Sequence, residues 1–591
     1  MKRSSRRALG LVTAAVAGAS LVLVAPGVAL ADKGGIANPG SEKNNGRFQA
    51  VQLLSFNDYH GHIASPDFHE DEDDPDFDPA DLFYGANDVG GGEFLASKLA
   101  ELREDAPKDR TLTVAAGDLI GGSPFLSGLF HDEPSVESLE AIGLDLSSVG
   151  NHEFDEGTEE LLRMQNGGCH PDDGCYFPSA PYDGADFEWL AANVIEKDGG
   201  ESLLPGTSVE EVDGMKIGFI GMTLEATPTL VSPAGVSTVD FLDEVETANA
   251  EAAKLQEMGV EAIVVLLHEG GLPTGGGVGD CVGVSDPILT IASDMDPAID
   301  MLVTGHTHQP YVCSIADPNG DPRLVTSAAS YGRVVTETAL VIDTKTGDVN
   351  RKKTSAQNHL VTGVEAAPEI TSIVEKWDAL AGEIGGRVVG TVAEDITGDS
   401  GGDRGIETPM GNLVADAILW GTDGADEGGA EIAFMNIGGV RASLLLAPKY
   451  DEGPGEVTYA EAYDVNPFGN LIVSIDMTGA DIKAVLEQQY DPSRSRNYLA
   501  LGVSEGFEYT WDDGQPQGSK VSDMQLNGVD IDPAGTYRVA VYNFLAGGGD
   551  SFTAFTNGTN LLGGPEDLAN FVAFLEANPG LTAPGDRVAG L

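Results

Sequence analysis

The stretch LSSVGNHEFDEG, residues 146–157, ends a short apolar run with an amide, an imidazole and a carboxylate. Asn151, His152 and Asp155 lie within five residues of one another, directly after a glycine. In layered α/β folds the ends of the strands gather at one edge of the sheet, and binding sites form there. A bland loop could hold any one of these groups, so the interpretation depends on how the other strands end.

Four other apolar runs end in the same residue types. They are LLSFNDYHGH with Asp58 and His60, TLTVAAGDLIGG with Asp118, AIVVLLHEGG with His268, and MLVTGHTHQP with His306 and His308. A single histidine at a strand end is more often structural, but five such runs in chain order are hard to obtain by chance. Their oxygen and nitrogen donors suit a pair of divalent ions.

The spacing of apolar residues predicts an α/β fold. From Gln52 to about Asp343, β-rich runs alternate with helical segments such as 93–104 and 243–258, which is typical of layered sheets and helices. An amphipathic helix over 366–384 then marks a boundary.

Beyond that helix a second β/α region begins. It has strands near EIAFMN, IVSIDM and YRVAVY. The pattern also predicts helices over 410–420 and 479–489.

The charge of the chain limits its partners. Lys and Arg number 32 against 95 Asp and Glu, a formal net charge of -63. Such a surface repels nucleic acid and anionic membranes. A small anionic substrate would need a local positive site against that field.

The N-terminus predicts export. A basic start, an apolar stretch and Ala29-Leu30-Ala31 identify residues 1–31 as a removed signal peptide. Residues 32–46 are polar and Gly-rich, and we expect disorder there. No later run reaches about 18 apolar residues, so we expect no membrane span and a secreted, extracellular protein. The pattern leaves general and twin-arginine export open.

Four cysteines fit an oxidising compartment. They allow three pairings, and we favour 169–175 and 281–313 over a zinc site, whose usual spacing they do not match. The acidic insertion 65–81 is interpreted as a solvated loop, with a calcium loop as the alternative.

The order D-x-H … G-D … G-N-H-E … H … G-H-x-H resembles the two-metal metallophosphoesterases. The second half of the chain narrows the resemblance to the 5′-nucleotidase family, which includes secreted UDP-sugar hydrolases. The resemblance implies an N-terminal four-layer αββα sandwich over 47–360, a linker helix over 361–386, and a smaller C-terminal α/β substrate-binding domain over 387–591.

The same resemblance implies two divalent ions, such as zinc, manganese or cobalt. One ion takes Asp58, His60, Asp118 and His308, and the other takes Asp118, Asn151, His268 and His306, so that Asp118 bridges them. Some relatives carry Gln or Asn in place of His308, which leaves the identity of the metal open.

On this resemblance His152 binds no metal. It contacts the phosphate and stabilises charge as the phosphorus–oxygen bond breaks, and Asp155 holds the orientation of its ring. A metal-activated water attacks in line.

In the second half the resemblance selects six residues that contact the substrate. They are Arg404, Asn436, Arg441, Phe468, Phe544 and Asp550. The arginines would meet the phosphate or a carboxylate-like edge of the substrate, the two phenylalanines would sandwich a base, and the aspartate would bind ribose hydroxyls. Related enzymes carry a further arginine after the first, where positions 405–408 here are Gly-Ile-Glu-Thr.

These residues imply a secreted hydrolase of nucleoside 5′-monophosphates, with a small-molecule nucleotide as its partner. Alternatives on the same scaffold are a UDP-sugar pyrophosphatase and a 2′,3′-cyclic-nucleotide phosphodiesterase. A non-catalytic nucleotide-binding or adhesion protein is a third alternative, which the complete set of ligand residues disfavours.

Overall fold

The computed structural model describes residues 46–591 except 65–89, 105, 107–109, 172, 232–234, 399–402, 425–426, 450–451, 493 and 495. The expected signal peptide, nearly all of the expected disordered segment 32–46, and the acidic insertion 65–81 lie outside the described residues.

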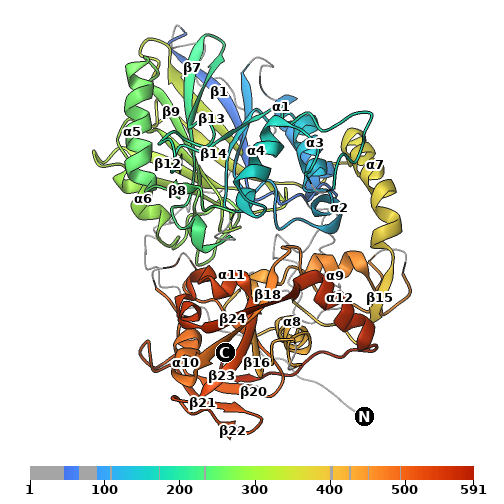
Figure 1. Cartoon of the computed structure of the whole chain (residues 1–591). Coiled ribbons are helices and arrows are strands. Elements are labelled where there is room, and N and C mark those ends of the chain that lie inside the picture. The colour runs from blue at the N-terminus through green and yellow to red at the C-terminus, as the bar shows by residue number, and fades with distance from the viewer. Residues whose placement is uncertain are drawn as a thin grey trace, which may run out of the picture. The chain divides into compact units, whose positions relative to one another are not determined.

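Two six-stranded sheets form the centre of the first half of the chain (Figure 1). The first has the order β14 (Ser355–Leu360), β13 (Val334–Asp343), β1 (Phe48–Phe56), β2 (Thr111–Ala116), β3 (Leu146–Ser148), β4 (Glu188–Leu190). The second has the order β11 (Tyr311–Ala316), β12 (Pro322–Ser327), β10 (Met301–Thr304), β9 (Ala262–His268), β7 (Met215–Thr223), β6 (Thr207–Val212). The four strands β1 to β4 run parallel, as do β12, β10, β9 and β7.

Successive side chains of a strand point to opposite faces of the sheet, and this alternation separates the layers. Val51 and Leu53 of β1 pack with Val264 of β9 in the core between the sheets. Leu54 and Phe56 point the other way, into the helices on the outer face. These helices are α1 (Gly91–Glu104), α3 (Glu133–Ile142) and α4 (Thr158–Asn166), whereas α5 (Glu244–Glu257) and α6 (Ile288–Asp294) cover the second sheet (Figure 1). The predicted four-layer αββα sandwich is therefore confirmed.

The second half is also built of sheets and helices. A five-stranded sheet has the order β19 (Leu501–Val503), β16 (Ile432–Asn436), β23 (Thr536–Tyr542), β18 (Leu471–Thr478), β24 (Thr559–Glu566). A four-stranded sheet has the order β22 (Val529–Asp530), β21 (Val521–Leu526), β20 (Phe507–Trp511), β25 (Val588–Ala589). The helices include α8 (Pro409–Trp420), α9 (Tyr459–Val465), α10 (Gly479–Glu487) and α12 (Asp567–Ala577).

Helix α7 (Pro368–Gly385) connects the two halves, and it matches the helix expected over 366–384. Its Trp377 is buried beside Phe130 and donates a hydrogen bond from Nε1 to Glu137 of α3 at 2.8 Å. The helix is thus anchored in the core of the first half.

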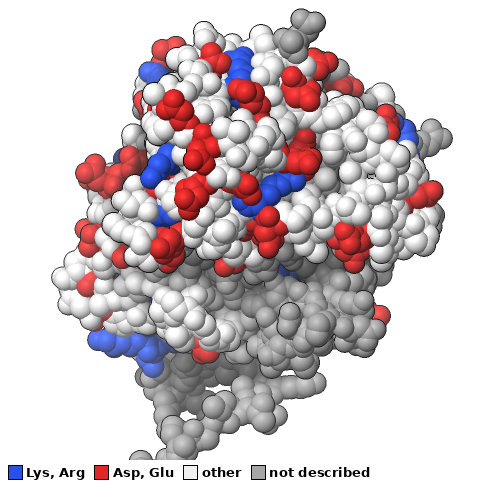
Figure 2. Space-filling model, turned by 90° about the horizontal axis from the view of Figure 1, so that it is seen from below, with Lys and Arg blue, Asp and Glu red and all other residues white. Residues whose placement is uncertain are grey.

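Acidic side chains are spread over the face shown in Figure 2, with basic groups between them. This agrees with the net charge of -63. Within the described part of the chain, no helix is both long and apolar enough to cross a membrane.

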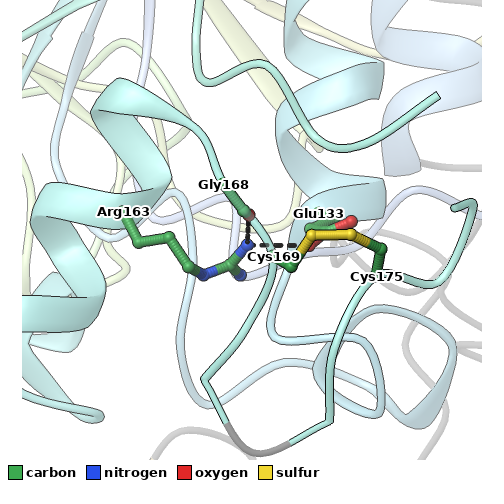
Figure 3. Close-up of a disulfide and its surroundings, with 5 residues drawn as sticks. All are labelled: Glu133, Arg163, Gly168, Cys169 and Cys175. Carbon is green, nitrogen blue, oxygen red and sulfur yellow. Dashed lines mark hydrogen bonds and ion pairs between the residues drawn. A yellow bond between two sulfur atoms is a disulfide. The ribbon is translucent and has the colours of Figure 1, made fainter.

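Both predicted disulfides are present, Cys169–Cys175 and Cys281–Cys313. The Cys169–Cys175 disulfide lies beside Arg163 of α4 (Figure 3). Arg163 Nη1 donates to Gly168 O and to Glu133 Oε1, both at 2.8 Å. The short disulfide loop is therefore tied to α3 and α4.

Candidate active site

Five parallel strands from both sheets deliver polar residues to one place. The metal-ligand candidates of the first half lie just after β1, β2, β3 and β10. One more candidate, His268, is the last residue of β9. Six of the selected residues have a left-handed backbone: Asp58 (φ 51), His60 (φ 48), Asp118 (φ 51), His306 (φ 70), His308 (φ 58) and Asp550 (φ 53). Such strain in non-glycine residues concentrates at functional sites.

Asp118 lies at the centre of the cluster. Its Oδ2 is 2.9 Å from His268 Nε2 and 3.6 Å from His60 Nε2, so one oxygen faces both histidines. Its Oδ1 accepts a hydrogen bond from the backbone N–H of His152 at 2.8 Å. One carboxylate therefore contacts two histidine rings and the backbone of a third histidine.

Backbone carbonyl groups orient two of the histidine rings in the cluster. Nδ1 of His60 bonds Gly121 O and Nδ1 of His268 bonds Ala116 O, each at 2.7 Å. Because a carbonyl only accepts, both Nδ1 atoms carry a hydrogen, and in a neutral ring the Nε2 atom then carries the lone pair. Nε2 of His60 is 3.3 Å from Nε2 of His308. Nε2 of His268 is buried and faces Asp118 Oδ2 at 2.9 Å.

Carboxylate oxygens and imidazole nitrogens that converge in this way fit a cation. The cluster contains three groups of donor atoms that could hold an ion: Asp58, His60 and His308; Asp118, His268 and His306; and His60, Asp118 and His152. Burial lowers the pKa of His60 and of His308 well below the usual value, which keeps both rings neutral as metal ligands must be. Burial also opposes protonation of His268, but the Asp118 carboxylate raises its pKa to about 10.

Backbone and amide contacts complete the cluster. The Asp58 carboxylate accepts from the N–H of His306 at 3.0 Å, and its Oδ1 lies 3.3 Å from His308 Nε2. Asn151 Oδ1 lies 3.0 Å from His306 Nδ1. All seven residues expected to hold metal thus lie together.

His152 stands at the side of this cluster. Its Nδ1 bonds Asp155 Oδ2 at 2.7 Å, and its Nε2 lies 3.2 Å from Nη2 of Arg441. Burial lowers the pKa of His152, but the carboxylates of Asp155 and Asp118 outweigh it, so that its pKa is raised. The ring is oriented by a carboxylate on one side and open to a polar partner on the other.

The residues expected from the second half are brought together only in part. The guanidinium of Arg441 lies 5.0 Å from the ring centre of Phe468, and that ring stacks on His152 at 5.8 Å. Asn436 Nδ2 donates to Asp550 Oδ2 at 2.9 Å. Phe544 is half-buried and its ring lies against Gly549, so it is placed beside Asp550.

Sequence analysis missed Glu153, the residue after His152. Its buried carboxylate accepts from the N–H groups of Asp118 at 2.9 Å, Leu119 at 2.7 Å and Gly150 at 2.5 Å. It therefore joins the ends of β2 and β3. The only signal in the sequence is its place inside GNHEFD.

Sequence analysis also missed Arg496, which lies in the loop between α10 and β19. Its Nη2 donates to the carbonyl of Thr307, between His306 and His308, at 2.8 Å. Burial lowers the pKa of Arg496, and Asp58 opposes that shift. No motif marked this arginine in advance.

Comparisons with known proteins find related chains. A family model described as "5'-nucleotidase, C-terminal domain" matches residues 388–557. The endonuclease YhcR of Bacillus subtilis is 33% identical over 89% of this chain, which spans 40% of that protein. The cell wall protein Lmo0130 of Listeria monocytogenes is 31% identical over 89% of this chain, which spans 67% of that protein.

The fold matches a solved structure over most of its length. The crystal structure of a 5′-nucleotidase precursor from Thermus thermophilus aligns with a TM-score of 0.71 and 25% identity. The alignment covers 91% of this chain and 99% of that one.

Replacing Glu153 tests its role as the link between the ends of β2 and β3. Glu153→Ala leaves three buried N–H groups without their acceptor, at about 1–3 kcal/mol each. We expect the free energy of unfolding to fall by roughly 3–5 kcal/mol in chemical denaturation. Glu153→Gln, which keeps one carbonyl acceptor, should lose less. Equal stability of Glu153→Ala and the wild type would contradict this role.

Proposed function

We propose that this chain, which belongs to the 5′-nucleotidase family, hydrolyses nucleoside 5′-monophosphates to a nucleoside and phosphate. One observation carries the proposal: His152, beside the carboxylate and histidine cluster, lies 3.2 Å from Arg441 of the second half. A group that can assist bond cleavage and a group that can bind phosphate therefore meet at one point.

Seven residues would hold two divalent ions, since their donor atoms converge as described. They are Asp58, His60, Asp118, Asn151, His268, His306 and His308. When bound, such ions supply Lewis acidity to a water nucleophile and to the phosphate oxygens. Asp118, whose Oδ2 faces His60 and His268, would be shared between them.

His152 would act on the phosphate ester itself. Its Nδ1–H is held by Asp155, so Nε2 is the atom left to face the substrate. In hydrolysis the bond from water oxygen to phosphorus forms, the bond from phosphorus to the 5′ oxygen breaks, and the leaving oxygen takes up a proton. A raised pKa favours an imidazolium that stabilises the charge developing there.

The second half would supply recognition of the nucleotide. Arg404 and Arg441 would hold phosphate oxygens, because guanidinium groups offer paired donors. Phe468 and Phe544 would stack on a base, and Asn436 with Asp550 would bind ribose hydroxyls. Stacking is worth about 1–3 kcal/mol per base and tolerates different bases.

We also propose that the enzyme works outside the cytoplasm, with a signal peptide over 1–31. Two disulfides support an oxidising compartment.

The proposed domains keep the boundaries 47–360 and 387–591, with the linker between them.

The charge of the chain argues against a polymeric nucleic acid substrate, although one relative is named an endonuclease. A net charge of -63 repels a long polyanion, whereas a mononucleotide needs only a local positive site. UDP-sugars and 2′,3′-cyclic nucleotides remain the alternatives that the assay below separates.

Metal-dependent release of phosphate tests the proposal. Purified mature protein should release phosphate from AMP faster than from UDP-glucose or 2′,3′-cyclic AMP. It should hold two divalent ions, lose activity on chelation and regain it when ions are restored. Faster hydrolysis of UDP-glucose or of the cyclic nucleotide would show that the proposed substrate class is wrong. Full activity of metal-free protein would refute the metal site.

His152 and Asp155 should be separable by their effects. His152→Ala should lower turnover of AMP roughly 10²–10⁴-fold, the range for a positioned acid–base or charge-stabilising group, with metal content near normal. Asp155→Asn should do less harm because it only disturbs the ring's orientation. The metal content of each variant should be measured together with its kinetics. Loss of an ion in His152→Ala would show that His152 is a metal ligand.

Phe544 should matter only for substrates that have a base. Phe544→Leu keeps an apolar side chain but removes the ring, so kcat/KM for AMP should fall about 10- to 100-fold from ~1–3 kcal/mol of lost stacking. Hydrolysis of p-nitrophenyl phosphate, which has no base, should change little, and Phe544→Tyr should behave as wild type. Equal damage to both substrates in a folded protein would make Phe544 a packing residue.

A further inference from the structure

Arg496 is an arginine near the site that no motif predicted, and it contacts the metal-ligand loop directly. Its Nη2 donates to Thr307 O at 2.8 Å, and Thr307 separates His306 from His308. This bond uses one of the five N–H donors of the guanidinium. The side chain therefore joins a loop of the second half to the loop that follows β10.

The loop that carries Arg496 is closed at its base. Tyr490 and Tyr498 form an isolated antiparallel bridge, and the N–H of Asp491 donates to Asn497 O at 2.8 Å. Arg494 lies two residues before Arg496 but turns elsewhere, with its guanidinium 5.1 Å from the ring centre of Phe552. The two arginines of one loop thus have different surroundings.

Three arginines lie within electrostatic range of one another near the site. Burial lowers the pKa of Arg404 most, and Arg496 and Arg441 lower it further. Such mutual repulsion between cations is relieved when an anion lies among them. Nε of Arg441 is buried and has no hydrogen-bond partner among the described residues, so a donor is left for that anion.

We propose that Arg496 is a third arginine that binds the phosphate of the substrate, and that it favours doubly charged phosphate monoesters over singly charged diesters. The inference rests on the proposed function, which it deepens by naming the charge class of the substrate. A dianion gains about twice the attraction of a monoanion from each guanidinium at the same distance. Its contact with Thr307 holds Arg496 on the side of the site where His306 and His308 lie.

The experiment uses the full metal-loaded enzyme with two matched inhibitors, methyl phosphate and dimethyl phosphate, at a pH where the first is a dianion. In Arg496→Met the inhibition constant of methyl phosphate should rise roughly 10- to 100-fold, the loss expected for a charged hydrogen bond. The inhibition constant of dimethyl phosphate should rise less, by about 3- to 10-fold, because a monoanion loses about half as much attraction. The KM for AMP should rise with the methyl phosphate constant, and kcat should change less.

Two variants control for damage to the loop. Arg494→Met should leave all constants within about threefold of wild type, and Arg496→Lys should recover part of the methyl phosphate affinity because it keeps the charge. If Arg496→Met does not fold, Arg496→Lys and Arg496→Gln provide the same comparison.

The outcomes separate the two hypotheses. An unchanged methyl phosphate constant in folded Arg496→Met, or equal weakening of both inhibitors, overturns this inference while leaving AMP hydrolysis by the wild type intact. Failure of the wild type to hydrolyse AMP would instead refute the proposed function.

Discussion

The carboxylate of Asp118 is the group on which the site depends. One of its oxygens faces His60 and His268, and the other holds the backbone of His152. Neighbouring residues make room for it, since a side chain at Gly150 would clash with Asp118. Strands of both sheets must end at this carboxylate. The two sheets must therefore pack correctly against each other for the residues of the site to meet.

Much of the first half could be predicted from local patterns. Alternation of apolar residues marks strands such as β1 and β9, and the polar residues that follow them must lie at one edge when the strands run parallel. The helix expected over 243–258 is α5, and the one expected over 410–420 is α8. Both expected disulfides are present, Cys169–Cys175 across one short loop and Cys281–Cys313 between separate segments.

The rest depends on contacts between residues distant in sequence. Glu153 resembles any polar residue in GNHEFD, and its role emerges only when β2 lies beside β3. Arg496 meets Thr307 across 189 residues, so no periodicity could reveal it. The small sheet β20–β22 with β25 and the helix α9 also passed unnoticed, because their short strands and turns carry little periodicity. The left-handed backbone at Asp58 and Asp118 has no signature in residue type alone.

The 3.2 Å contact between Arg441 and His152 would act as an internal competitor in the proposed reaction. A substrate phosphate that reaches His152 takes over a place that the guanidinium already fills, so it exchanges contacts and its net binding energy is smaller than the sum of the new ones. The same exchange runs in reverse after cleavage, when Arg441 can return to His152 as phosphate departs. Arg441 would thereby limit the affinity for the bound substrate and ease the release of phosphate. Both effects favour turnover.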